Sequence, residues 1–141
     1  MLVDHGSRRA EANAQLERVA ERLRHRLPDW IVRAAHMELA SPSVDEAVAA
    51  CAAEGAGEIV IHPYFLAPGS HGAVDVPELA RRAALRHPDV SIRVTEPLGF
   101  DERLLDVILE RIGGTAAQTP AAGSGTATTA DDPGPRSRRR G

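Results

Sequence analysis

The apolar residues of this chain follow two alternating patterns between residues 1 and 112. Short apolar runs at residues 2–3, 30–36, 58–62 and 90–94 are typical of β-strands. The stretches between and after them repeat apolar residues every three or four positions, which is the period of an α-helix. Strands that alternate with helices predict an open parallel sheet of about four strands with helices on both faces, an α/β fold.

Polar residues at the expected helix starts sharpen these boundaries. Ser7 is expected to cap the first helix, which Pro28 ends, and Ser43 and Glu46 have capping-box spacing. Asp75 is placed as the cap of a helix with Pro77 in its first turn, and Asp101 as the cap of the last helix. The last helix has an apolar stripe that we expect to be buried: Leu104, Leu105, Ile108, Leu109 and Ile112. Residues 58–62 form the most apolar run, which indicates a central strand.

The pattern stops near residue 112. Residues 113–141 are rich in Gly, Ala, Thr and Pro and end in an arginine cluster at 136–140. Such a segment buries too little apolar surface to offset the entropy cost of ordering it. We therefore predict one α/β domain over residues 1–112 and a disordered tail with a basic C-terminus over residues 113–141.

Composition narrows the class of protein. Hydrophobic residues make up 43% of the 141 residues but aromatic residues only 3%, so the core is expected to consist of Ala, Val, Leu and Ile. No apolar run reaches the roughly 20 residues that span a bilayer, and no leader pattern is seen, which predicts a cytoplasmic protein. The single cysteine, Cys51, fits a small core residue. A net charge of −3 gives no general attraction to nucleic acid.

Three residues with chemical potential follow three successive predicted strands. His5 precedes Gly6 after the first strand, Glu38 follows the second, and His71 lies in a Gly- and Ser-containing loop after the third. The carboxyl ends of parallel strands share one edge of the sheet, where ligands bind in open α/β folds. Imidazole and carboxylate groups suit divalent cobalt, nickel, iron or zinc. The pattern predicts a metal or proton-transfer site at that edge.

Each of these residues also has a structural interpretation. His5 alone fits a helix-entry loop where it binds backbone groups, and Glu38 alone fits an ion pair as well as a base. His36 and His62 stand at strand ends, where structural roles are favoured, and His25 and His87 fit solvated positions near helix ends. The phosphohistidine phosphatases also carry a His-Gly pair after their first strand, but they have arginine where this chain has Asp4.

The motifs resemble one known family. These are Val3-Asp4-His5-Gly6-Ser7-Arg8, Glu38-Leu39-Ala40 with Pro42-Ser43, the run from Pro63 to His71, Asp75-Val76-Pro77, and Glu96-Pro97-Leu98-Gly99. In this order they resemble the small class II chelatases of the CbiX and SirB type, over nearly all of residues 1–112. The run from Pro63 to His71 with Asp75-Val76-Pro77 is its most specific part.

The resemblance implies an enzyme, a lyase that inserts Co²⁺ or Fe²⁺ into sirohydrochlorin during cobalamin, sirohaem or haem biosynthesis. It implies that His5 and His71 bind the metal and that Glu38 is the nearby catalytic carboxylate. Ser7, Arg8, Arg9 and Ser70 are the expected contacts to the tetrapyrrole, and position 70 is arginine in many members. The metal, including Ni²⁺ as an option, is then a substrate, and no tightly bound cofactor is expected. Longer members carry two such domains around one cleft, so this chain is expected to form a homodimer.

Two other functions compete with metal insertion. A non-catalytic protein that binds and delivers a metal or a tetrapyrrole needs the same site, and a phosphotransfer enzyme would use His5 as its nucleophile. Turnover of sirohydrochlorin separates the first from a chelatase, and release of phosphate or a phosphohistidine would support the second. The residues do not select among cobalt, iron and nickel.

Overall fold

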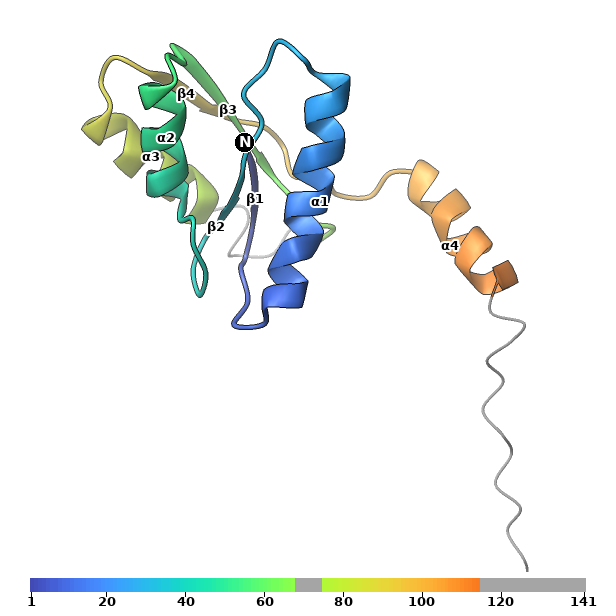
Figure 1. The fold of residues 1–141 in the computed structure, drawn as a ribbon. Coiled ribbons are helices and arrows are strands. Elements are labelled where there is room, and N and C mark those ends of the chain that lie inside the picture. Colours follow the sequence, from blue (N-terminus) through green and yellow to red (C-terminus); the bar gives the residue numbers. More distant parts are fainter. Residues whose placement is uncertain (68–74, 115–141) are drawn as a thin grey trace, which may run out of the picture. The chain divides into compact units, whose positions relative to one another are not determined.

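The computed structural model describes residues 1–67 and 75–114 (Figure 1). The elements follow in the order β1 (Leu2–Asp4), α1 (Ala10–Arg26), β2 (Ala34–His36), α2 (Val44–Ala53), β3 (Glu58–Pro63), α3 (Val76–Arg86), β4 (Ser91–Val94) and α4 (Arg103–Gly114). The chain divides into a compact unit of Met1–Leu105, which holds the sheet, and a second unit of Asp106–Gly141.

The four strands form one parallel sheet in the order β2-β1-β3-β4. Leu2 of β1 is in register with Ala34 of β2 on one side and with His62 of β3 on the other. Helix α1 covers one face of the sheet, and α2 and α3 lie together on the opposite face (Figure 1). This arrangement confirms the predicted α/β fold with helices on both faces, and it confirms that β3 is an interior strand.

The core is split by the sheet into two layers of small aliphatic side chains. On the α2 and α3 face the layer consists of Val3, Ala35, Val44, Ala47, Val48, Cys51, Ile59, Ile61, Val76, Ala80 and Ala83. On the α1 face it consists of Leu2, Leu16, Ala20, Val32 and Ala34. Cys51 is buried with a free thiol, as its Ala-rich surroundings predicted. Alanines at the contacts allow the helices to approach the sheet closely, which explains how a domain with few aromatic residues packs.

The cap residues predicted at the helix starts are confirmed for one helix and not for two others. The capping box of α2 is confirmed, because the Ser43 hydroxyl accepts the Glu46 N–H and the Glu46 carboxylate accepts the Ser43 N–H. The cap predicted at Ser7 is wrong, since α1 begins at Ala10 with Arg9 in the cap position and no side-chain cap bond. Asp75 does precede α3, with Pro77 in the first turn, but it makes no side-chain cap bond.

Two other expectations concern the second strand and the last helix. The second strand covers only Ala34–His36 instead of 30–36; its register with β1 begins at Ala34 opposite Leu2, while Trp30, Ile31 and Val32 line an apolar cavity. The burial of the last helix's apolar stripe stays a prediction, because α4 belongs mostly to the second unit and is described by itself. Amphipathic spacing shows only which side of a helix would be covered if another surface packed there.

The cavity lies at the amino-terminal edge of the sheet, where β3 extends beyond the start of β1. Its volume is about 520 Å³, and Met1, Trp30, Ile31, Ile59 and Val60 are among the residues that line it. The Met1 ammonium donates a hydrogen bond of 2.8 Å to the Val60 carbonyl, and burial lowers its pKa. Within the described ranges, no helix is long and apolar enough to cross a membrane.

Candidate functional site

The connections that follow β1 and β3 leave the carboxyl edge of the sheet toward opposite faces. These strands are neighbours, but β1 is followed by α1 on one face and β3 by a connection to α3 on the other. In open α/β sheets, ligands bind where the chain leaves adjacent strands in opposite directions. His5 follows β1 at this point, and the segment that carries His71 joins β3 to α3.

His5 and Glu38 meet at this edge. The His5 Nε2 lies 3.2 Å from the Glu38 Oε1, and the two side chains are 44% and 58% exposed. Backbone pairing of β1 and β2 continues into the loops, because the Met37 N–H donates to the Asp4 carbonyl and the Glu38 N–H to the His5 carbonyl. The structure thus brings together an imidazole and a carboxylate that the sequence placed after separate strands, and it leaves both open to solvent.

Gly6 allows the His5 loop to approach the Glu38 loop. It adopts φ +83°, in the left-handed region that favours glycine. A Cβ at this position would lie 2.0 Å from the Glu38 carbonyl oxygen and 3.0 Å from the His36 Cβ. Any other residue would therefore push the two loops apart and separate His5 from Glu38.

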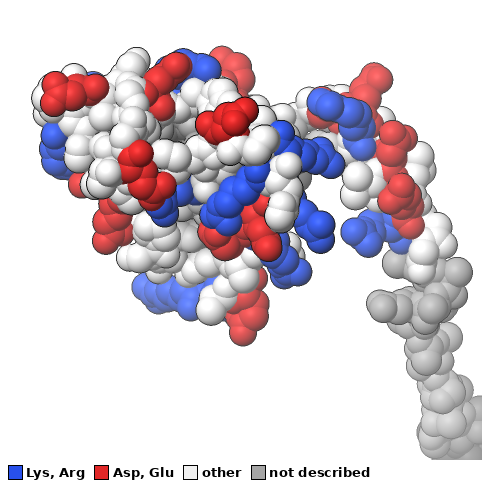
Figure 2. All heavy atoms as spheres, turned by 45° about the horizontal axis from the view of Figure 1, so that its top comes forward, with Lys and Arg blue, Asp and Glu red and all other residues white. Residues whose placement is uncertain are grey.

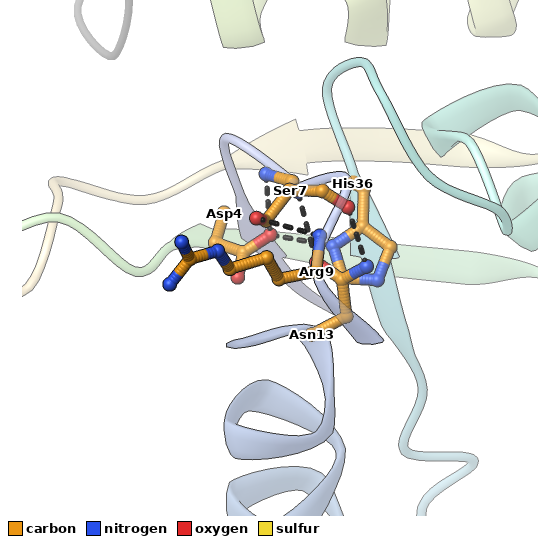
Figure 3. Close-up of polar contacts among 6 residues, drawn as sticks. Asp4, Ser7, Arg9, Asn13 and His36 are labelled. Carbon is orange, nitrogen blue, oxygen red and sulfur yellow. Dashed lines mark hydrogen bonds and ion pairs between the residues drawn. The ribbon is translucent and has the colours of Figure 1, made fainter. Parts of the chain in front are cut away.

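Asp4 and His36 form a polar contact beneath the loop that carries His5 (Figure 3). They are partners in the β1–β2 register, and the His36 Nδ1 lies 2.6 Å from the Asp4 Oδ1. The same oxygen accepts the Gly6 N–H at 2.9 Å. The sequence favoured a structural role for His36 but did not predict its pairing with Asp4. Their shared position as the last residues of neighbouring strands is the signal that could have revealed it.

Asn13 fixes the other end of the loop (Figure 3). Its side-chain amide donates to the Ser7 carbonyl at 2.8 Å, and its Oδ1 accepts the Ser7 N–H at 2.9 Å. The Ser7 hydroxyl accepts the Arg9 N–H at 3.1 Å. Arg8 and Arg9 are exposed at the start of α1, next to His5 in the chain. The sequence offered no motif that singled out Asn13.

A pocket of about 260 Å³ lies beside Glu38. Asp75, Glu78 and Arg82 at the start of α3 line it together with Glu38, so α3 supplies one of its walls. Hydrogen bonds from Arg81 and Arg82 lower the pKa of Glu78 to about 2, which keeps it ionised and its charge compensated. Figure 2 shows the same balance on a larger scale, with basic and acidic side chains interspersed over the visible face of the domain.

His71 and Ser70 lie outside the described residues, so the structure does not place them. Among residues 1–67 and 75–114, no group of three or more His, Cys, Asp and Glu side chains is arranged to hold a metal ion. Of the predicted catalytic residues His5, Glu38 and His71, the structure therefore shows His5 and Glu38 in contact.

The other histidines lie elsewhere. The His62 Nδ1 lies 2.8 Å from the Thr95 hydroxyl, and burial, followed by the positive N-terminus, lowers the pKa of this imidazole. His25 is exposed in the last turn of α1 and His87 is half-buried at the end of α3. None of the three contributes to the His5–Glu38 contact.

These features define a class: an open parallel α/β domain with a histidine and a carboxylate at the carboxyl edge of its sheet. Residues 1–115 match the CbiX family, and the chain belongs to that family. It is 43% identical over 112 residues to a chloroplastic sirohydrochlorin ferrochelatase of Arabidopsis thaliana, covering 79% of this chain and 50% of the relative. It is 30% identical over 138 residues to a sirohydrochlorin cobaltochelatase of Methanocaldococcus jannaschii, covering 81% and 96%.

Solved structures share the fold. The structure of SirB from Bacillus subtilis with Fe³⁺ superimposes with a TM-score of 0.74 at 27% identity, covering 83% of this chain and 46% of that one. A CbiX protein from Marinobacter aquaeolei gives a TM-score of 0.67 at 34% identity, covering 81% and 92%. The chain thus spans about half the length of the plant relative and of SirB, and nearly the full length of the two shorter proteins.

Proposed function

We propose that this protein is a sirohydrochlorin chelatase, a lyase that inserts Co²⁺ or Fe²⁺ into the tetrapyrrole for cobalamin or sirohaem biosynthesis. The relatives in plants and archaea carry ferrochelatase and cobaltochelatase names, and this chain belongs to their family. The observation that carries the proposal is the exposed contact between His5 and Glu38 at the carboxyl edge of the sheet.

The geometry of this contact suits a divalent cation. Two ligand atoms that each lie about 2.1 Å from one metal are about 3.0 to 3.4 Å apart at coordination angles near 90 to 110°. The His5 Nε2 and Glu38 Oε1 are separated by 3.2 Å. His71 is proposed as the further metal-binding histidine. A site with few protein ligands suits a metal that has to leave the protein for the macrocycle.

The same residues can handle the protons. Metal insertion replaces two pyrrole N–H protons with one divalent cation, so each turnover needs proton acceptors. A neutral imidazole at His5 or His71 either binds metal or accepts a proton, and the Glu38 carboxylate can accept one as well. Their exposure lets the protons pass on to solvent.

We assign Ser7, Arg8, Arg9 and Ser70 to binding the polyanionic substrate. Guanidinium groups bind carboxylates through paired hydrogen bonds, and the start of a helix favours negative charge. The exposed Arg8 and Arg9 stand at the start of α1 beside His5, which supports this assignment.

The test is metallation of sirohydrochlorin followed by visible absorbance, with Co²⁺, Fe²⁺ and Ni²⁺ supplied separately and the nonenzymatic rate subtracted. Catalysed insertion of Co²⁺ or Fe²⁺ is expected, with loss of the catalysed rate in His5→Ala and Glu38→Gln and an unchanged rate in the exposed control His25→Ala. Binding of the tetrapyrrole or metal without catalysed insertion would refute the chelatase and favour a delivery protein.

A homodimer in the cytoplasm is the proposed working form. One domain supplies one wall around a large flat macrocycle, and a second copy in a symmetric contact would supply the other. Light scattering at micromolar concentration is expected to report twice the 15.0 kDa chain mass. A monomer with full activity would contradict the dimer but not the chelatase.

A further inference from the structure

The Asp4–His36 pair lies directly behind the proposed metal site. His36 is 3% exposed and is the only buried polar or charged residue within the described part of the chain. Its Nδ1 approaches the Asp4 Oδ1 to 2.6 Å, and Asp4 immediately precedes His5. Asp4 Oδ1 also accepts the N–H of Gly6, which immediately follows His5. One carboxylate oxygen therefore connects β2 to the loop on both sides of His5.

Burial of an imidazole in a hydrophobic domain needs compensation. An unpaired polar group in such a position costs free energy that a leucine of similar volume would not. A carboxylate accepts hydrogen bonds and does not donate them, so the Nδ1 of His36 carries the proton in this contact. Hydrogen bonds to an ionised carboxylate are also stronger than those between neutral groups. The contact thus holds the Asp4 carboxylate in one orientation.

That orientation matters for His5. The backbone bonds between the β1 and β2 loops fix Asp4 and His5 on the strand side, but Gly6 lies beyond them at the turn. The Asp4 carboxylate bond to the Gly6 N–H holds the turn in the conformation that presses Gly6 against the Glu38 carbonyl. Loss of this bond would remove one restraint on the turn that carries the His5 ring beside the Glu38 carboxylate.

We propose that Asp4 and His36 are positioning residues for the metal site, with His36 orienting Asp4 and Asp4 fixing the turn that presents His5 to Glu38. Neither residue touches the substrate in this scheme. The proposal rests on the function proposed above. Partners that orient metal ligands through hydrogen bonds contribute roughly 10- to 100-fold to metal affinity or activity in other proteins.

The test compares His36→Leu with His36→Asn. Leucine removes the Nδ1 donor at similar volume, whereas the asparagine amide places an N–H close to the position of Nδ1. We expect His36→Leu to weaken binding of Co²⁺ alone by roughly 10-fold and to alter the visible absorption of bound Co²⁺. We expect kcat to fall by a similar factor with KM for sirohydrochlorin unchanged, and His36→Asn to restore both within about threefold. His87→Leu, a matched substitution at the end of α3, is expected to behave as wild type.

A second pair of variants covers the case in which His36→Leu does not fold. Asp4→Asn keeps an acceptor oxygen and Asp4→Ala removes it, so hydrogen exchange at the Gly6 amide is expected to be fast in Asp4→Ala and close to wild type in Asp4→Asn. Equal impairment of His36→Leu and His36→Asn would overturn the proposal, because it would show that ring volume matters and the hydrogen bond does not. Wild-type Co²⁺ binding and kcat in His36→Leu, or a protected Gly6 amide in Asp4→Ala, would also overturn it.

The two proposals fail in different ways. If the wild-type protein binds Co²⁺ but does not metallate sirohydrochlorin, the proposed function is wrong. The Co²⁺ affinities and the Gly6 exchange rates would still follow the predicted order if the positioning role is right. If the wild-type protein metallates sirohydrochlorin and the His36 and Asp4 variants keep its Co²⁺ affinity and kcat, only the positioning role is wrong.

Discussion

The two edges of the sheet are built from the same strands but differ in chemistry. At the carboxyl edge, two successive polar contacts join Asp4 to His36 and His5 to Glu38; the first is partly buried and the second is open to solvent. At the amino edge, mainly apolar side chains surround a cavity of about 520 Å³ beside Met1. The cavity at the amino edge is larger than the pocket of about 260 Å³ beside Glu38, yet the candidate functional side chains gather at the carboxyl edge.

The difference between the two edges suggests that one contributes mainly to the reaction and the other mainly to the stability of the fold. The exposed polar groups at the carboxyl edge add little to the packed core, so they are available for metal and proton transfer. The cavity at the amino edge is lined mainly by apolar side chains, and some of them, such as Leu2, Cys51 and Ile59, belong to the packed layers. We therefore expect substitutions at one edge to change rate and those at the other to change stability.

The largest effect is expected for His5→Ala. If His5 handles the metal or a leaving proton, turnover of sirohydrochlorin falls roughly 10²-fold or more. The free energy of unfolding should change by less than about 1 kcal/mol, because the side chain is partly exposed. The sequence predicts the same for His71→Ala.

Metallation rates and urea titrations on the same preparations check both parts. His25→Ala is the control, since that side chain is exposed on α1. A near-normal rate in folded His5→Ala would remove His5 from the mechanism, and a large loss of stability would remove the contrast between the edges.

Ile59→Ala tests the opposite edge. Ile59 is 4% exposed in the core and also lines the cavity, so truncation is expected to cost about 2 kcal/mol, near the lower end for such changes. Turnover per folded molecule should stay at the wild-type value. Chemical denaturation gives the first quantity and a metallation assay the second.

Ile31→Ala provides the matched control, because Ile31 lines the same cavity but is exposed. It should cost less than about 1 kcal/mol. Equal costs for the two variants would show that burial in the core does not decide stability at this edge.

Ser43→Ala tests whether the start of α2, at the carboxyl edge of the sheet, contributes to stability. Loss of the capping box of α2 is expected to lower the free energy of unfolding by about 1 kcal/mol. Turnover should change little, because Ser43 contacts Glu46 and not the site. Thermal unfolding beside Ser91→Ala, an exposed serine at the start of β4, measures the difference. Identical melting temperatures for the two variants would contradict the prediction.

The smallest effect is a pH dependence due to His62. Burial lowers the folded-state pKa of this imidazole below 6.5, so the unfolded chain binds the proton more readily. Stability should therefore fall as the pH decreases through about 6.5 and stop falling from this cause once the pH is below the folded-state pKa. His62→Gln should show a shallower loss between pH 7 and pH 5 in urea titrations, and an unchanged slope would exclude His62 as its source.

The sequence predicted correctly those features that depend only on residues close together in the chain. Ser43 and Glu46 predicted their reciprocal cap, and the apolar run at 58–62 predicted an interior strand, because both depend on neighbours in the chain. The cap expected at Ser7 does not form, since the Ser7 hydroxyl accepts the Arg9 N–H while the Asn13 side chain, six residues away, holds the Ser7 backbone. The apolar spacing of α4 predicts a buried stripe, but which surface would cover that stripe does not follow from its spacing.

By itself, the sequence determined that three chemically capable residues follow three successive strands, and that those strands form a parallel α/β sheet. Only the tertiary structure decided that His5 and Glu38 lie 3.2 Å apart and that Asp4 and His36 support them from below. The physical reason is that strand order and register are set by packing between distant segments. The order β2-β1-β3-β4 places the end of β1 beside both β2 and β3, and no local pattern in the chain encodes those neighbours.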